Sequence, residues 1–366
     1  MDFFQRQDNA RRRTRWLVAY FAGAIFGLAC TFYVVSLSPY FHAHPEKEGS
    51  FWHPELFQWV VGVVLVITAV GSLTKFIKLR KGGKAIVLAL GGRPLAAPAT
   101  DPDERQLQNI VEEMSIASGV PMPAIYVLDR EFGINALVAG LRPEDAVIAV
   151  TKGAMQFLSR DELQGIIAHE FSHILNGDMR LNLRLVSWLH GILWIAMIGR
   201  GLLEAARRCI PWNSEANDLK KAGLGLFFFG SFVGVIIYGL GSIGAFFGRL
   251  IKSAVARQRE LLADAAAVQF TRNPLGLASA LKKIGGLSHG SRIRSPMAEE
   301  ASHMFFGNGL RSPWFGFFAT HPSLRQRIKL LDPTFDGRFP QVSFPVATAK
   351  VPPVIPPAIP PPLPVR

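Results

Sequence analysis

The chain has 366 residues, of which 49% are hydrophobic, 18% are charged and 27 are Phe. This is more apolar side chain than one soluble core of that size needs, so the composition favours a membrane protein over a soluble one. The formal charge of +13 does not indicate a nucleic-acid partner, because the Lys and Arg residues cluster beside apolar runs, where they would face anionic lipid. Two cysteines cannot form a disulfide framework.

The first 77 residues predict a basic N-terminus (1–15) followed by a transmembrane hairpin (16–77). The hairpin contains two apolar runs, 16–38 and 56–77, each long enough to cross a hydrocarbon core of about 30 Å. Basic residues flank both outer ends, whereas the loop between the runs carries three Glu. The positive-inside rule therefore predicts a cytoplasmic N-terminus, an external loop and a cytoplasmic chain after the second run.

Residues 78–184 have the pattern of a cytoplasmic domain rather than of a membrane segment. Two stretches have helical periodicity, and the second opens after Ser159 as a cap and closes at Gly177. Three short β-prone stretches with turn residues between them lie inside this segment. The expected helices cover 103–118 and 161–176, and the expected strands cover 124–129, 135–140 and 146–151.

Residues 185–248 predict a second hydrophobic hairpin. Its first run, 185–199, is short for a crossing, so a tilted helix and a re-entrant hairpin both stay open; its second run, 222–248, is ample. Residues 249–338 then return to a helical, charged pattern and form the second part of the cytoplasmic domain. The Pro-rich tail, 339–366, is expected to be extended or disordered.

The central motif is His169-Glu170-Phe171-Ser172-His173. On a helix, two histidines four residues apart lie on one face and can bind one metal ion together. Glu170 stands beside the first ligand, where it can hold a metal-bound water and take its proton. A pair of surface histidines on an amphipathic helix would leave the position of Glu170 unexplained. The motif therefore predicts a hydrolytic site with one Zn²⁺ per chain.

A catalytic zinc needs a third protein ligand and one position open to water. Glu260 and Asp264 share a helix face in RQRELLADAAA, so Glu260 is the candidate ligand and Asp264 a partner for a ligand histidine. Taken alone, two acids at this common spacing are better explained as ordinary surface residues that pair with Arg257 or Arg259. Two apolar runs separate His173 from Glu260, however, so the chain returns to the side it left and the two residues can meet.

The sequence resembles the HtpX-like membrane zinc metallopeptidases, relatives of the CAAX prenyl proteases. The resemblance covers most of residues 121–178, 257–267 and 320–328, in the segments PMPAIYVLD, INALVAG, AVIAVTKGAM, DELQGIIAHEFSHILNGD, RQRELLADAAA and THPSLRQRI. It implies a mainly helical α+β chain: a zincin-type catalytic domain with a small β-sheet, joined to about four transmembrane helices.

For the site, the resemblance implies ligands His169, His173 and Glu260, with Glu170 as general base and acid and Asp264 as partner of a ligand. It also implies that His321 binds the tetrahedral intermediate and that Arg327 braces the acidic residues. Ser323 stands where the family often has Pro. Zincin-like proteases add substrate as a strand to a sheet edge. The strand beginning at Asn135 and Ala136 and the strand 146–151 are both candidates for that edge.

The implied activity is hydrolysis of peptide bonds in membrane or misfolded proteins, at the cytoplasmic face of a bacterial inner membrane, for protein quality control. An intramembrane protease is disfavoured because charged residues such as Arg160, Asp161 and Asp178 bracket the motif. Two rival functions stay open: a prenyl-peptide protease of the CAAX type, and a non-catalytic membrane scaffold that binds zinc.

Overall fold

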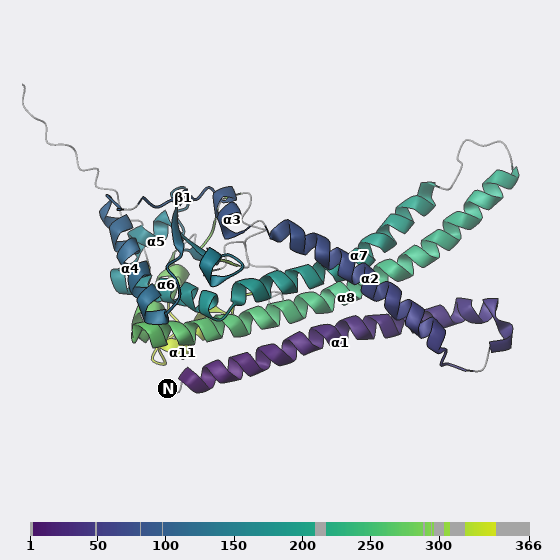
Figure 1. Ribbon diagram of the computed structural model, residues 1–366, viewed down its shortest axis with the longest axis horizontal. Helices are drawn as coiled ribbons and strands as arrows, with labels where there is room; N and C mark the ends of the chain where they lie inside the picture. Colours follow the sequence, from purple (N-terminus) through teal and green to yellow (C-terminus); the bar gives the residue numbers. More distant parts are fainter. Residues whose placement is uncertain are drawn as a thin grey trace, which may run out of the picture.

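The computed structural model describes residues 3–47, 50–80, 82–96, 98–208, 217–287, 290–293, 295, 304–307 and 319–341. The molecule is elongated, with a mixed helix-and-sheet part at one end and long helices extending from it (Figure 1). Four helices are long and apolar enough to cross a membrane: α1 (Phe3–Ala43), α2 (Pro54–Leu79), α7 (Asp178–Arg208) and α8 (Asn217–Thr271). The prediction of a mainly helical α+β chain with about four membrane helices is confirmed.

Helices α7 and α8 are continuous from the membrane part into the helix-and-sheet part (Figure 1). At about 1.5 Å per residue, the 31 residues of α7 reach about 46 Å and the 55 of α8 about 82 Å, well beyond a core of about 30 Å. Residues 185–199 therefore form the middle of one continuous helix, and whether the hairpin 185–248 crosses fully or is partly re-entrant stays a prediction. The expected boundaries at 184/185 and 248/249 fall inside these helices, and the division into domains stays a prediction.

Glycines let the long helices approach closely. Gly71 of α2 meets Gly191 of α7, where a Cβ on Gly191 would overlap the carbonyl oxygen of Thr68. A Cβ on Gly199 would likewise overlap the backbone of Tyr238 in α8. Lipid offers little hydrophobic drive for helix association, so such backbone contacts contribute much of the packing between membrane helices.

The sheet has four strands in the order β1-β2-β4-β3. Strands β2 (Ala124–Leu128) and β4 (Val147–Thr151) are parallel, whereas β1 (Arg93–Pro94) and β3 (Ala136–Ala139) are antiparallel to their neighbours. The three predicted strands are present, each shorter by one or two residues. Strand β3 is an edge, and β4 is interior. This answers which of the two candidate strands lies at a sheet edge.

Both faces of the sheet are covered. Ala136 and Val138 pack on the core formed with α4 (Pro102–Ser118) and α6 (Arg160–Leu175), and Leu137 packs on α3 (Gly83–Ala89). The remaining short elements are η1 (Pro45–Lys47), η2 (Pro143–Asp145), α5 (Lys152–Phe157), α9 (Pro274–Gly286) and α11 (Leu324–Leu331).

Helix α6 begins and ends where its capping residues predict. The Ser159 hydroxyl accepts from the Glu162 backbone N–H, and the Glu162 carboxylate accepts from the Ser159 N–H, which makes a capping box. Gly177 has a φ of +67°, a backbone conformation that glycine adopts without strain, and α7 begins at the next residue. The turn therefore brings Asp178 back beside the last turn of α6.

Candidate functional site

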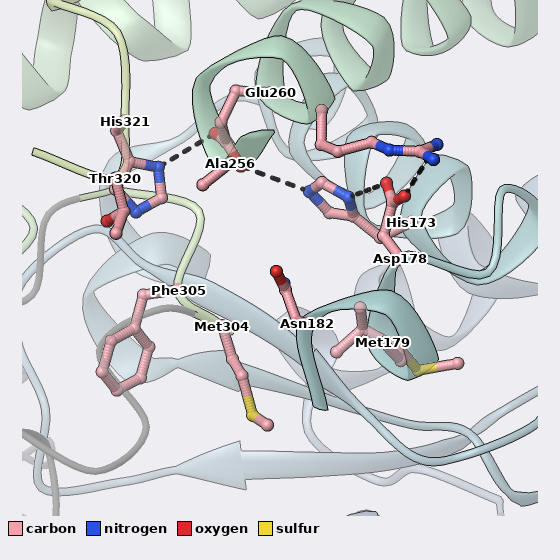
Figure 2. A pocket seen from close by; sticks show the side chains of 12 residues that line it. His173, Asp178, Met179, Asn182, Ala256, Glu260, Met304, Phe305, Thr320 and His321 are labelled. Carbon is pink, nitrogen blue, oxygen red and sulfur yellow. Dashed lines mark hydrogen bonds and ion pairs between the residues drawn. The ribbon is translucent and has the colours of Figure 1, made fainter. Parts of the chain in front are cut away.

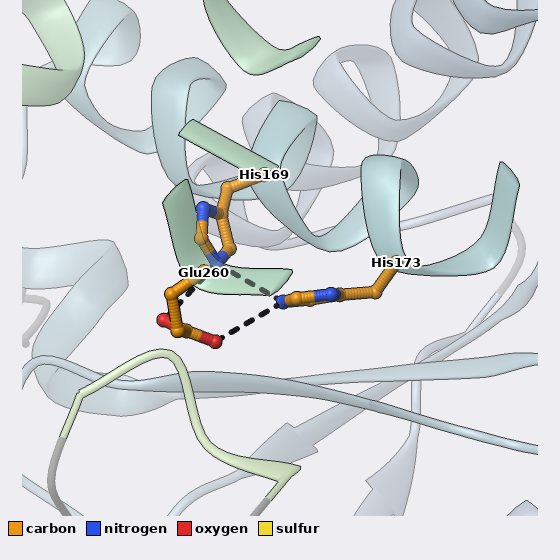
Figure 3. A group of neighbouring side chains, drawn as sticks. All are labelled: His169, His173 and Glu260. Atoms are coloured by element: carbon orange, nitrogen blue, oxygen red, sulfur yellow. Dashed lines mark hydrogen bonds and ion pairs between the residues drawn. The ribbon is translucent and has the colours of Figure 1, made fainter. Parts of the chain in front are cut away.

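Two histidines of α6 and one carboxylate of α8 point at a common centre (Figure 3). The Nε2 atoms of His169 and His173 are 3.1 Å apart, and Glu260 oxygens lie 3.7 and 3.5 Å from them. Ligands about 2.0–2.2 Å from a tetrahedral zinc are separated by roughly 3.3 Å. These three residues therefore lie close enough to share one ion, and their donor set is one that zinc accepts.

Each histidine has a carboxylate behind it, and each carboxylate has an arginine. His169 Nδ1 lies 2.9 Å from Asp264 Oδ1, and Arg327 contacts both Asp264 oxygens at 2.7 and 2.8 Å. A neutral imidazole that presents Nε2 to a metal donates from Nδ1, so this arrangement fixes the ring orientation and the tautomer.

His173 also has a carboxylate behind it and an arginine behind the carboxylate. The sequence alone predicted this role for neither of these two residues. His173 Nδ1 lies 2.8 Å from Asp178 Oδ2, and Asp178 Oδ1 forms an ion pair with Arg259 Nη1 at 3.0 Å. The sequence held a signal for Asp178, because it follows His173 by five residues across the Gly177 turn. Arg259 was expected only as a possible partner for Glu260 or Asp264.

Glu170 is fully buried; the Val138 backbone approaches its carboxylate, but neither oxygen has a hydrogen bond of normal geometry within the described residues. Burial raises the pKa of Glu170 to about 8. A buried carboxylate without a partner costs stability, so its presence beside the His–His–Glu group calls for a function. A water molecule held between it and a metal would supply the missing partner.

The two histidines differ in their affinity for a proton. Burial lowers the pKa of His169 to about 4, so this ring is neutral and ready to bind a metal at neutral pH. Burial also opposes charge on His173, but hydrogen bonds to Asp178 and Glu260 overcome it and raise its pKa well above the usual value. A metal at the centre would replace that proton, so metal binding releases it.

His321 and Arg327 come from the C-terminal segment and contact the same carboxylate. Figure 2 shows the contact of His321 with Glu260. His321 Nδ1 lies 3.0 Å from Glu260 Oε2, and Arg327 Nη1 lies 3.2 Å from the same oxygen. Arg327 is almost fully buried, and it joins Glu260 to Asp264, the position in which an arginine can brace both acids. The cavity beside these residues measures about 30 Å³, room for one or two water molecules but not for a peptide.

The outer edge of β3 is paired with the chain's own segment Met304–Gly307. Phe306 N–H donates to Ala136 O at 2.8 Å, and Leu137 forms an antiparallel bridge with Phe305. The fully buried Asn135 side chain donates to Gly307 O and accepts from Gly307 N–H. Asn135 and Ala136 are therefore engaged within the chain in this conformation, and neither presents a free group to a substrate.

Comparison with known proteins gives consistent matches. The family model for peptidase family M48 matches residues 101–334. A protease HtpX homolog of Caldanaerobacter subterraneus subsp. tengcongensis is 35% identical over 277 residues, covering 75% of this chain and 86% of that protein. A protease HtpX homolog of Bacteroides fragilis is 30% identical over 286 residues, with 76% and 80% covered. Among solved structures, S. mikatae Ste24p matches with a TM-score of 0.40 and 18% identity over 88% of this chain and 66% of that one.

The fold and the family match together define a membrane-bound metalloprotease, with peptides as its substrates and a lipid bilayer as its surroundings. The chain belongs to peptidase family M48 and is similar to its HtpX members.

Proposed function

We propose that the chain is a zinc-dependent endopeptidase of the HExxH, gluzincin-like type, with one Zn²⁺ held by His169, His173 and Glu260. The observation that carries the proposal is the convergence of these three ligand atoms beside the buried carboxylate of Glu170. Calcium and magnesium prefer sites made of oxygen atoms, whereas two imidazoles with one carboxylate suit zinc.

Zinc bound there would polarise the scissile carbonyl and lower the pKa of the attacking water. Glu170 takes the proton from that water and delivers it to the leaving amine nitrogen, which its position next to His169 allows. His321 donates a hydrogen bond to the developing oxyanion. Asp264 and Asp178 keep the two imidazoles oriented, and Arg327 holds Glu260 and Asp264 in place.

The proposed location is the cytoplasmic face of a bacterial inner membrane. The basic clusters at 11–15 and 75–84 support it through the positive-inside rule, and the N-terminus lies at the same end of the molecule as the sheet and α6 (Figure 1). The HtpX relatives from Caldanaerobacter and Bacteroides are bacterial proteins. Membrane and misfolded proteins are the proposed substrates, and quality control is the proposed role.

The proposed substrate edge is the outer side of β3, from Asn135 and Ala136 towards Val138, which lines the cavity beside the ligands. A peptide added there would use the backbone groups of β3 that now pair with Met304–Gly307. Substrate binding therefore requires this segment to leave the edge.

The test uses the full chain in lipid nanodiscs, with metal content and cleavage of casein and of a membrane protein measured on the same sample. We expect about one zinc in wild type and in Glu170→Gln, with cleavage only in wild type, and loss of zinc in Glu260→Ala. Glu113→Gln, which changes an exposed ion pair between α4 and Arg160 at the start of α6, is the matched control and should keep both. Equal cleavage by Glu170→Gln would refute the catalytic proposal and favour a zinc-binding scaffold. Cleavage of a prenylated tetrapeptide alone would instead favour prenyl-peptide processing.

A further inference from the structure

Four basic side chains gather where three membrane helices meet near the sheet-containing end of the molecule. Lys75 and Lys78 lie near the end of α2, His190 lies in α7, and Lys252 lies in α8. The end of α2 lies beside α7, and α8 runs along α7 at the same level (Figure 1). We call these four residues the basic junction.

Backbone contacts fix the geometry of the basic junction. Gly71 of α2 touches Gly191 of α7, so His190 sits at this crossing and Lys75 lies one helical turn from it. On the other side of α7, Leu189 packs against Gly248 of α8, which places Lys252 one turn further along that helix. These contacts hold the three helices, and with them the backbone positions of the four residues, in this arrangement.

The basic side chains of the junction lie near one another and not near carboxylates. The charged neighbours of His190 are Lys75 and Lys78, and the charged neighbour of Lys252 is Lys75. Within the described part of the chain, none of these side chains forms an ion pair with an acidic residue. Lys75, His190 and Lys252 are only partly exposed.

Two other partly buried lysines of the chain do form ion pairs with carboxylates. Lys282 pairs with Asp332 at 2.7 Å, and Lys283 pairs with Glu162 at 2.6 Å. Partly buried cations that repel one another cost free energy unless an anion neutralises them. The basic junction therefore lacks a counter-charge that the same chain supplies elsewhere.

We propose that the basic junction is a binding site for a phosphate group, supplied by the headgroup of an anionic phospholipid. A phosphate has the oxygen acceptors and the negative charge that several converging cations need. Lys75 and Lys78 lie at the end of the apolar run of α2, the level at which lipid phosphates lie, and cations on the cytoplasmic side attract anionic lipids. A free phosphate ion has the same chemistry, and the experiment separates the two sources.

The experiment reconstitutes the full chain in nanodiscs of phosphatidylcholine alone or with phosphatidylglycerol, and measures thermal stability and lipids retained in native mass spectrometry. Detergent-solubilised protein titrated with inorganic phosphate forms the soluble arm. The variants are Lys75→Gln, Lys252→Gln and their combination. Lys84→Gln is the control, because it removes an exposed lysine of α3 just beyond α2.

We expect wild type and Lys84→Gln to gain stability in phosphatidylglycerol and to retain that lipid. Each junction substitution should weaken retention about fivefold, since a basic residue near the membrane surface contributes on the order of 1 kcal/mol. In phosphatidylcholine alone, Lys252→Gln should be at least as stable as wild type, because it removes an unneutralised cation. That result also shows that the variant folds.

The proposal would be overturned if all variants retained phosphatidylglycerol equally. It would also be overturned if Lys84→Gln lost as much of this lipid as the junction variants. Stabilisation by inorganic phosphate without any preference for the anionic lipid would assign the site to a free ion and overturn the lipid assignment.

Discussion

Replacing Asp178 by Asn tests whether this carboxylate orients a metal ligand. Asp178 accepts from His173 at 2.8 Å with one oxygen and pairs with Arg259 at 3.0 Å with the other. An amide keeps the size but loses the charge, so it weakens the bond to the imidazole and turns an N–H₂ group either to the ring or to the guanidinium. Loss of such an orienting partner typically weakens metal binding 10–100-fold, or about 1.4–2.7 kcal/mol.

The assay is competition for zinc between the full chain in nanodiscs and a chromophoric chelator. Asp178→Asn should raise the dissociation constant by one to two orders of magnitude while the protein stays folded. Asp336→Asn, the same change at an exposed residue beside Arg338, should leave it unaltered. An unchanged zinc affinity in Asp178→Asn would refute the orienting role, because the geometry leaves no other group to replace it at His173 Nδ1 among the described residues.

Three further predictions concern stability. In the metal-free protein, burial raises the pKa of Glu170 from 4.5 to about 8. The protein therefore has its full stability below pH 4.5, where the carboxyl group is neutral in both the folded and the unfolded chain, and loses part of it as the pH rises to 8. Glu170→Gln should therefore have a larger free energy of unfolding than wild type at pH 9, by at most about 5 kcal/mol, but not at pH 4. A difference in free energy that does not depend on pH would contradict this. Gly191→Val should lower the melting temperature strongly because it pushes α2 off α7, whereas Gly201→Val, with open space around it, should not; equal effects would argue against the crossing. Ser159→Ala should cost about 1 kcal/mol through loss of the α6 cap, measured by denaturant unfolding, and no change would refute the capping role.

The local structure of α6 could be predicted because its signals are local. Ser159 caps the helix, Gly177 ends it, and the spacing of His169 and His173 places both rings on one face whatever the rest of the chain does. The approach of Glu260 was a topological inference rather than a local one. It depended only on two apolar runs returning the chain to the same side.

The contacts that sequence reasoning missed depend on tertiary geometry. No local sequence pattern predicts that Asp178 contacts His173 or that Arg259 pairs with Asp178, because the two acids and two arginines around the ligands could pair in several ways. The pairing of β3 with Met304–Gly307 joins segments more than 160 residues apart, which no periodicity reports. The run 185–199 looked short because Arg184 and Arg200 end it, whereas the helix itself continues past both residues to a length of 31 residues.

X-ray absorption at the zinc edge, on the zinc-loaded full chain, tests the shared metal site most directly. We expect a first shell of imidazole nitrogen and carboxylate or water oxygen at about 2.0–2.2 Å, without sulfur, in wild type, and no such shell in Glu260→Ala, which loses the zinc. A shell that is unchanged in Glu260→Ala, or that persists when His169 and His173 are both replaced, would contradict the assignment of these three residues.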